Sequence, residues 1–330
     1  MKICICGGGS LGHVCAGVLA SQPGVELNIL SGHPDLWQHE IVVKDTDGKT
    51  YSANIRRISS DPKEVVEGQD IILFCLPGYL IEKTLREIKP FVGAAAVGTV
   101  VSSTGFFSFA HEVLGADAKL FGFQRVPFIA RVAEYGRSAN LLGYKSDLAA
   151  VLENISDREA FRAELERLFL TPVRLLDSFY EVALSNSNPI LHTGRLYTMF
   201  YGRENEVFDR NILFYKEWTD EASQLLIEMD AELFRLLDKL GVTSLPTLLD
   251  YYGCTDAASL TRKLQSIPAF QSIYSPMKQV EGGWMVDFGS RYFTEDFPFG
   301  LKTIYDVAHS EQVPCPNIDR VLAWGINNIK

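Results

Sequence analysis

Glycines follow the first apolar segment of the chain in a spacing that few folds accommodate. Residues 2–6 have the pattern of a buried strand, and Cys6-Gly7-Gly8-Gly9-Ser10-Leu11-Gly12 connects them to a predicted helix at 11–21. G-x-G-x-x-G between a strand and a helix is typical of a dinucleotide-binding β-α-β unit. Gly7 permits the tight turn, Gly9 lets the backbone approach a pyrophosphate, and Gly12 lets the helix pack closely on the strand. The residues expected to bind the dinucleotide here are Gly7, Gly9, Ser10, Leu11 and Gly12.

Short apolar runs alternate with helical patterns through the first half of the chain. The runs at 25–30, 70–76 and 96–101 have the character of strands buried on both faces, as a parallel sheet requires. The turn signal Asp45-Thr-Asp-Gly48 predicts a hairpin insertion between these strands. Ser156, with Glu159 three residues later, predicts the N-cap of a further helix.

The pattern changes near residue 180 to one of long helices. The clearest runs over residues 220–240, where an apolar stripe ends before Gly241. A chain of 330 residues also favours two domains over one. We therefore predict an α/β, doubly wound Rossmann-type domain over residues 1–178, followed by a mainly α-helical substrate domain over residues 179–330.

The net charge and the spacing of the cysteines limit the classes of ligand and partner that the sequence predicts. The formal net charge of −10 argues against nucleic acid, whose phosphates need a basic surface. We expect no transmembrane helix, because no apolar run reaches the roughly 18 residues that one needs. The six cysteines form no CxxC pair, so neither a zinc site nor a disulfide framework is predicted. We expect a cytoplasmic protein that acts on small molecules, and a homodimer is compatible with this sequence.

The end of the second strand bears on the choice of nucleotide. An acid is expected there if an adenosine 2′-hydroxyl is bound as in NAD enzymes, and this chain has Ser31. Since no carboxylate is present to repel a 2′-phosphate, the sequence favours NADP over NAD, with His33 as an auxiliary contact. Leu76 and Pro77 follow the next strand at the same predicted edge, and we expect them to line the nicotinamide half of the site.

Two segments of the second half contain candidate catalytic residues. Asn188-Pro-Ile-Leu-His192 has a histidine behind a polar turn, which suits either catalysis or a structural histidine. Residues 291–301, from Arg291 past Asp296, embed charged residues among aromatic ones, as in a partly buried ionic cluster or a surface ion-pair loop.

Together with the glycine fingerprint and Phe214-Tyr-Lys-Glu-Trp-Thr219, these two segments resemble the octopine/nopaline (opine) dehydrogenase family. The resemblance implies that His192 is the acid/base and that Asp296 is its partner. It also implies that Arg291 clamps a substrate carboxylate and that Asn188 binds substrate; Arg131 is a second candidate clamp. Thr193 departs from the family, which often has proline there, and Ser31-Gly-His33 lacks the family's frequent basic residue.

The activity that the resemblance implies is an NAD(P)H-dependent reductive condensation of an amino acid with a 2-oxo acid through an imine. One alternative is a ketopantoate-reductase-like 2-oxo acid reductase, whose site typically uses a lysine; residues 181–195 contain none. Another alternative is a non-catalytic NADP-binding sensor, against which the joint presence of Asn188, His192, Arg291 and Asp296 argues.

Overall fold

The computed structural model describes residues 1–329, which fold into two compact units. The first spans Met1–Ala183 and the second begins at Leu184. The boundary expected after residue 178 falls between the last strand of the first unit and the short helix α6 (Tyr180–Ala183), which the structure groups with the first unit.

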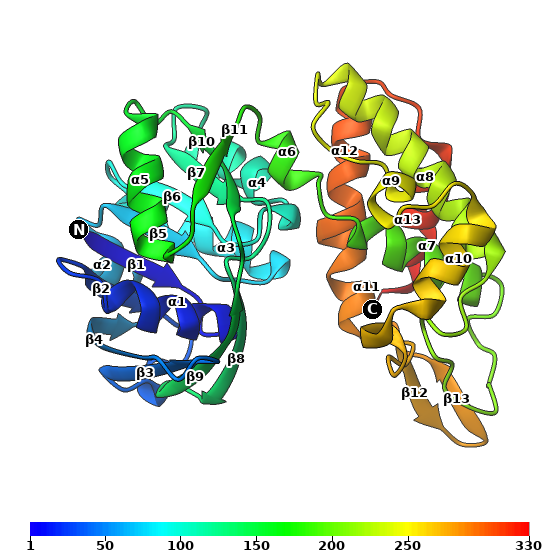
Figure 1. Ribbon diagram of the computed structural model, residues 1–330, viewed down its shortest axis with the longest axis horizontal. Helices are drawn as coiled ribbons and strands as arrows, with labels where there is room; N and C mark the ends of the chain where they lie inside the picture. Colours follow the sequence, from blue (N-terminus) through cyan, green and yellow to red (C-terminus); the bar gives the residue numbers. More distant parts are fainter. Residues whose placement is uncertain (330) are drawn as a thin grey trace. The chain divides into compact units, whose positions relative to one another are not determined.

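A large mixed sheet forms the first unit (Figure 1), and within the described residues it has eleven strands in the order β11-β10-β7-β6-β5-β1-β2-β4-β3-β9-β8. Its central strands, from β7 through β6, β5, β1 and β2 to β4, are parallel to one another. This arrangement confirms the doubly wound prediction. The strands are β1 (Lys2–Cys6), β2 (Glu26–Leu30), β3 (Glu40–Asp45), β4 (Thr50–Ser59), β5 (Ile71–Phe74), β6 (Ala96–Thr99), β7 (Leu120–Phe123), β8 (Phe128–Glu134), β9 (Ser138–Tyr144), β10 (Leu148–Glu153) and β11 (Val173–Leu176).

Helices cover both faces of this sheet, because successive side chains of a strand point to opposite faces. Ile3 and Ile5 of β1 join one apolar cluster with helices α1 and α5, whereas Cys4 and Cys6 join the other with α2, α3 and α4. All six cysteines of the chain are unpaired. The helices are α1 (Ser10–Ala20), α2 (Pro62–Val66), α3 (Gly78–Ile88), α4 (Phe106–Leu114) and α5 (Arg158–Phe169), with 3-10 turns η1 (Pro34–Leu36), η2 (Lys89–Phe91) and η3 (Ser102–Thr104).

Two local expectations were wrong. The expected hairpin is present, since β3 and β4 pair antiparallel, but it is no insertion, because β4 pairs in parallel with β2 and β3 extends the same sheet to β9. The place of this hairpin in the sheet depends on the pairing of β4 with β2 and of β3 with β9, which local turn signals do not encode. The N-cap of α5 is Asp157, not Ser156, because the Asp157 carboxylate accepts the Ala160 N–H at 2.9 Å.

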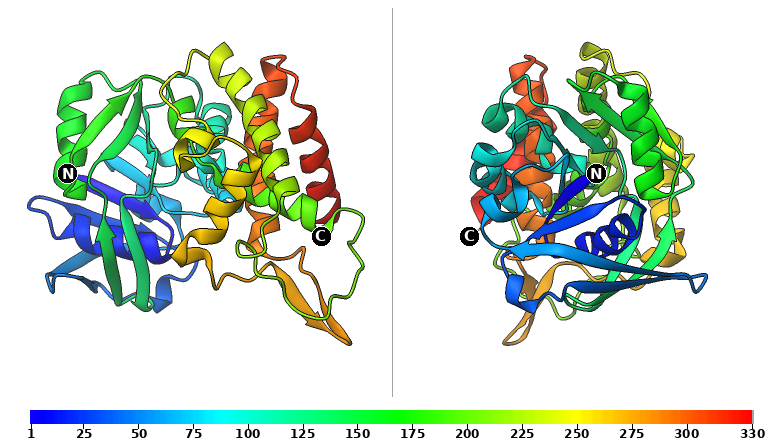
Figure 2. Two further views of the ribbon diagram at one scale, coloured as in Figure 1. Left: turned by 45° about the vertical axis from the view of Figure 1, so that its right-hand side comes forward. Right: turned by 90° about the vertical axis from the view of Figure 1, so that its left-hand side faces the viewer.

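The second unit is mainly helical, as predicted. The stripe on α8 (Asp220–Lys239) is buried from Leu225 to Leu237, and Gly241, with a φ of +71°, follows the helix end. A hairpin of β12 and β13 projects beyond the helices of this unit (Figure 2). The remaining elements are α7 (Asn188–Phe200), α9 (Leu248–Tyr252), α10 (Ala257–Ser266), η4 (Pro268–Phe270), β12 (Met277–Val280), β13 (Gly283–Val286), α11 (Arg291–Thr294), the π-helix η5 (Asp296–Leu301), α12 (Lys302–Ser310) and α13 (Pro316–Asn328).

Close contacts fix η5 between two helices. A Cβ added at Gly325 of α13 would lie 2.0 Å from the Phe297 ring, and one added at Gly300 would lie 2.8 Å from Pro189 of α7. Side chains at these two glycines would push η5 away from its neighbours, so small residues here set where η5 lies. Among the described residues, no helix combines the length and apolarity needed to cross a membrane.

Asp230, on the buried side of α8, makes the stability of the second unit depend on pH. Its carboxylate accepts the Leu248 N–H at 2.9 Å, and burial raises the pKa of Asp230 to about 6. The folded state therefore holds a proton here more tightly than the unfolded chain, whose aspartate pKa is about 3.9. The stabilising contribution is complete below about pH 4 and is lost as pH rises through about 6.

We expect Asp230→Asn to raise the free energy of unfolding by roughly 1–3 kcal/mol at pH 8, with almost no gain at pH 4, because the amide keeps the acceptor and carries no charge. Urea unfolding at the two pH values measures this, with the exposed Asp238→Asn on the same helix as control. An equal gain at both pH values would contradict the explanation.

Candidate active site

Three loops leave the central sheet at one edge. Cys6, the last residue of β1, is paired with Leu30 at the end of β2 and with Phe74 at the end of β5. The segments that begin at Gly7, Ser31 and Cys75 therefore emerge side by side at the carboxyl ends of parallel strands. That edge is where open α/β sheets bind ligands.

A pocket of about 410 Å³ lies at this edge. It brings together Gly7, Ser31, His33 and Leu76 of the residues that the sequence singled out. The other five are not in its lining: Gly9, Ser10, Leu11 and Gly12 lie at the start of α1, and Pro77 is the N-cap of α3. The rest of the lining consists of Cys6, Gly8, Leu30, Gly32, Ser60, Leu80, Lys83, Thr84, Glu87 and Tyr135.

The glycines have the geometry that a dinucleotide needs. Gly7 has a φ of +118°, which favours glycine, and its N–H donates to Leu30 O at 3.0 Å. A Cβ at Gly12 would lie 2.2 Å from Gly7 O, so α1 starts directly against the turn. Nothing lies within 4 Å of where a Cβ of Gly9 would be, which leaves room for a phosphate to approach the N-terminus of α1. The residues present thus fit a dinucleotide.

His13 holds this loop in place, a role that the sequence did not indicate. The side chain is fully buried; its Nε2 lies 2.7 Å from the Gly136 N–H and its Nδ1 lies 3.0 Å from Gly9 O. Because a backbone N–H can only donate, Nε2 is the acceptor and Nδ1 carries the hydrogen. Burial lowers the pKa of His13, which favours this neutral form.

Ser31 is buried beside Trp37. Its Oγ accepts hydrogen bonds from Trp37 Nε1 and from the His33 N–H, both at 3.2 Å. The Trp37 ring stacks on His13 with centroids 4.2 Å apart. With both lone pairs of Ser31 Oγ accepting, its hydroxyl hydrogen remains to donate to a ligand.

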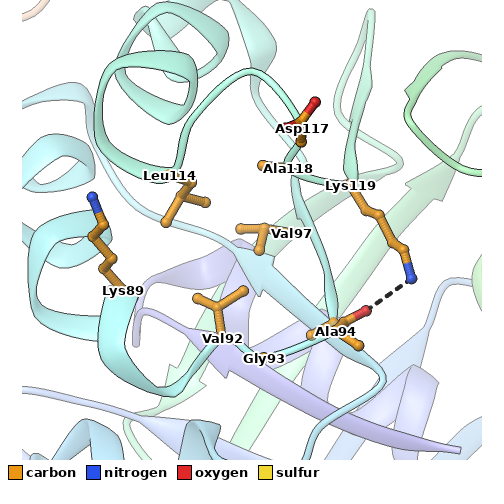
Figure 3. A pocket seen from close by; sticks show the side chains of 10 residues that line it. Lys89, Val92, Gly93, Ala94, Val97, Leu114, Asp117, Ala118 and Lys119 are labelled. Carbon is orange, nitrogen blue, oxygen red and sulfur yellow. Dashed lines mark hydrogen bonds between the residues drawn. The ribbon is translucent and has the colours of Figure 1, made fainter.

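Another pocket of the first unit lies at the opposite edge of the sheet (Figure 3). Its lining comes from the segments just before β6 and β7, and Lys119 Nζ donates there to Ala94 O at 3.2 Å. Since the amino ends of parallel strands meet at this edge, we do not assign the nucleotide to it.

The second unit brings His192 and Asp296 together. His192 lies in α7 and Asp296 is the first residue of η5, and His192 Nδ1 is 2.8 Å from Asp296 Oδ2. Both are largely buried, with 13% and 23% of their side chains exposed. The rings of Tyr292 and Phe214 stand beside the imidazole, at centroid distances of 4.8 and 5.8 Å.

Tyr215 is a third member of this group. Its hydroxyl lies 3.0 Å from His192 Nε2, and burial raises the pKa of Tyr215, so the phenol stays neutral. An ionised Asp296 can only accept, which places the hydrogen of a neutral imidazole on Nδ1 and makes Tyr215 the donor to Nε2. The stretch Phe214–Thr219 contributed to the family resemblance, but nothing in its pattern indicated this contact.

Arg195, one turn after His192 on α7, fixes the segment that carries Tyr215. It is buried and donates to Glu217 O at 2.6 Å and to Phe214 O at 3.3 Å. Burial lowers the pKa of Arg195 to about 10, which leaves it charged at neutral pH. The Tyr215 ring also stacks on Phe270, with centroids 4.2 Å apart.

The candidate substrate residues are not joined to the pair by direct contacts. Asn188 is exposed and lies four residues before His192 on α7, so helical spacing puts both on one face. Arg291 begins α11, next to Tyr292; it is exposed, and its side chain makes no hydrogen bond or ion pair with the residues that the structure describes. Arg131 is an exposed residue of β8 in the first unit, and its guanidinium donates to Ala130 O.

A Rossmann-type unit with a glycine-rich turn, followed by a helical unit with a buried His–Asp pair, defines a two-domain NAD(P)-dependent dehydrogenase. Residues 175–327 match the family described as NAD/NADP octopine/nopaline dehydrogenase, alpha-helical domain. The second unit of the chain thus matches the helical domain of the octopine/nopaline dehydrogenase family.

Full-length relatives agree with this assignment. Octopine dehydrogenase of Mizuhopecten yessoensis is 26% identical over 362 residues, covering 100% of this chain and 90% of the relative. Solved structures of octopine dehydrogenase with NADH and L-arginine and with NADH and pyruvate have TM-scores of 0.87 and 0.86 at 26% and 25% identity. Both matches cover 100% of this chain and 89% of the other.

Two glycine variants test the loop. Gly9→Ala should fold with a loss of less than about 1 kcal/mol, since its Cβ meets no atom, yet weaken NAD(P)H binding at least about tenfold by filling the space above α1. Gly12→Ala should lower both stability and affinity, because its Cβ would clash with the Gly7 backbone. Fluorescence titration and thermal unfolding measure the two effects; unchanged affinity in Gly9→Ala would contradict the placement.

Proposed function

We propose that the protein is an opine dehydrogenase that uses NAD(P)H to join an amino acid and a 2-oxo acid into a secondary amine. The observation that carries the proposal is the hydrogen bond between His192 Nδ1 and Asp296 Oδ2 in the helical unit. Relatives named octopine dehydrogenase, and their structures with L-arginine or pyruvate, support an amino acid and an oxo acid as the two substrates.

The proposed reaction has a condensation step and a reduction step. The amino group attacks the keto carbon, and loss of water leaves a C=N bond. A hydride added to the imine carbon and a proton on nitrogen then give the secondary amine. When bound, the reduced nicotinamide supplies that hydride.

His192 moves the proton in this proposal. An imidazole can accept and donate a proton at a ring nitrogen and therefore serves as base and acid in turn. Asp296 accepts from Nδ1, which leaves Nε2 to exchange a proton with the substrate on the side where the Tyr215 hydroxyl lies. Once the ring is protonated, the Asp296 carboxylate stabilises its charge.

Carboxylate recognition falls to the arginines. Both substrates carry carboxylates, and a guanidinium can hold one with two parallel hydrogen bonds. We assign this role to Arg291, an exposed residue that directly precedes Tyr292, whose ring lies beside His192, with Arg131 as a second clamp. Asn188, on the same face of α7 as His192, is assigned to a polar group of the substrate.

For the cofactor we propose a preference for NADP over NAD. Ser31 stands at the end of β2 without a carboxylate, and its hydroxyl hydrogen is free to donate. Lys83 and His33 line the same pocket; the Lys83 ammonium, which lies 3.8 Å from the Glu87 carboxylate, offers positive charge to a 2′-phosphate, and His33 offers a ring N–H. We place the enzyme in the cytoplasm, where its six unpaired cysteines suit reducing conditions.

The direct test is a matrix of amino acids and 2-oxo acids assayed with NADH and NADPH by absorbance. The proposal requires that nucleotide oxidation depend on both substrates. Oxidation with an oxo acid alone would instead indicate a simple 2-oxo acid reductase, and no oxidation with any pair would favour a binding protein without catalysis.

The dyad predicts a non-additive pair of losses. His192→Ala should lower kcat roughly 10²–10⁴-fold with NAD(P)H affinity nearly unchanged, and Asp296→Asn should also be severe. If the two act as a unit, the double variant should be little worse than the poorer single one. The His111–Glu153 pair of the first unit, at 2.7 Å, is a matched control whose variants should leave kcat unaltered. Fully additive losses would separate the roles of His192 and Asp296.

A charge placed at Ser31 tests the cofactor preference. Ser31→Asp should weaken NADPH far more than NADH, because a carboxylate repels the 2′-phosphate. Ser31→Ala, which removes the donor without adding charge, should have the smaller effect. The ratio of the two dissociation constants is the readout, and a ratio that stays constant in Ser31→Asp would show that Ser31 does not face the ribose.

The clamp predicts a loss in substrate binding alone. Arg291→Lys keeps the charge and loses the forked geometry, so KM for a carboxylate substrate should rise about tenfold, or ~1.4 kcal/mol, while nucleotide affinity stays unchanged. Arg203→Lys is the control, since Arg203 already pairs with Glu206. A fall in nucleotide affinity instead would reassign Arg291.

A further inference from the structure

Three potential metal ligands converge where α12 turns into α13. His309 lies in the last turn of α12, Cys315 is the N-cap of α13, and Asp319 follows in its first turns. His309 Nε2 is 2.9 Å from Asp319 Oδ1, Cys315 Sγ is 3.3 Å from the same oxygen, and all three ligand atoms lie within 4.8 Å of one another. None of these residues has a part in the proposed reaction.

The fold holds this corner in place. Glu232 of α8 is buried, and its carboxylate accepts the N–H groups of Asn317 and Ile318, each at 2.9 Å. The connecting loop is closed by a hydrogen bond of 2.8 Å from Val313 N to Ala308 O. The three ligand side chains are therefore attached to backbone that other contacts hold in place, as a preformed site requires.

We propose that His309, Cys315 and Asp319 form a site for one zinc-like divalent cation. Imidazole nitrogen, thiolate sulfur and carboxylate oxygen are the ligands that Zn²⁺ takes, at about 2.0–2.3 Å. Three atoms at those distances from one ion stand about 3.3–3.7 Å apart in a tetrahedron. The observed 2.9 and 3.3 Å lie within a few tenths of an ångström of this range, and the third pair, His309 Nε2 and Cys315 Sγ, lies within 4.8 Å.

The charges around the corner require both anionic ligands. Arg235 donates to Pro314 O and Lys239 to Glu311 O, so two cationic side chains reach the same loop. A thiolate and a carboxylate together balance the two charges of the ion, and Glu232 adds a negative charge close by. Loss of either Cys315 or Asp319 should therefore weaken binding more than loss of the neutral His309.

The spacing of the cysteines did not predict this site, because its ligands follow an H-x5-C-x3-D pattern with a single cysteine. The three residues meet only because α12 and α13 are folded against each other. Three protein ligands leave one position for water. Because α12 and α13 both pack against η5, whose first residue is Asp296, the ion would stabilise the two helices that support η5.

The test uses the purified full chain, stripped with a chelator and titrated with Zn²⁺ or Co²⁺. We expect one equivalent to bind with a Kd on the order of micromolar and to raise Tm by roughly 5 °C in excess metal. Co²⁺ should give the near-ultraviolet charge-transfer band of a thiolate–cobalt bond. Cys315→Ser should abolish that band and lower affinity at least about tenfold, whereas Cys254→Ser, a partly buried cysteine of the same unit, should keep both.

Asp319→Asn keeps the size of the side chain and serves where Cys315→Ser fails to fold; it too should lower affinity at least about tenfold. The proposal is overturned if no metal binds at one equivalent, or if the cobalt band persists in Cys315→Ser. The proposal is also overturned if the variants have a lower Tm but metal has no effect on the native chain. The three side chains would then form only a hydrogen-bonded contact between α12 and α13. None of these readouts depends on the proposed dehydrogenase reaction.

Discussion

The hydrogen bond between His192 and Asp296 is the contact on which the helical unit is organised. It joins residues 104 positions apart, and a gap of 1 Å would break it. The fold therefore fixes both ends: α7 packs on α8, while η5 is held between α7 and α13 by contacts at Gly300 and Gly325. Arg195 fixes the Tyr215 segment on the other side of the imidazole. Both ring nitrogens thus have a partner that the fold positions, and this suits a group that must carry its proton on a defined atom.

In the first unit, packing and hydrogen bonds likewise fix the backbone atoms of the glycine-rich loop. The register of β1 with β2 and β5 brings three loops to one edge, and the glycines let α1 begin directly against the turn. Behind them, His13 joins Gly9 to Gly136, and Trp37 joins the His13 ring to the Ser31 hydroxyl. A buried network of hydrogen bonds between neutral groups therefore fixes the backbone that would contact the phosphate and ribose groups. The glycine-rich loop itself has no charged side chain.

Much of this plan follows from local sequence. The glycine spacing after an apolar strand predicted β1, α1 and their turn, and the apolar stripe predicted α8, because each signal is complete within about twenty residues. The His192–Asp296 pairing came from family resemblance, since no local rule joins two segments so far apart. Tyr215 was missed for the same reason: its contact depends on the packing of residues 214–219 against α7 and Phe270. Ser156 was wrong by one residue because serine and aspartate are nearly equal as N-caps, and here the Asp157 carboxylate accepts the Ala160 N–H.

We propose that Asp296 holds His192 with its hydrogen on Nδ1, so that Nε2 is the reactive nitrogen. Nitrogen-15 NMR of the imidazole rings measures this directly, and the signals of His192, one of six histidines, are those missing from His192→Ala. We expect a neutral ring protonated at Nδ1 with a pyridine-type Nε2, and a mixture of tautomers in Asp296→Asn. A native His192 that carries its hydrogen on Nε2 would contradict it, because the nitrogen assigned to the substrate would then be unable to accept a proton.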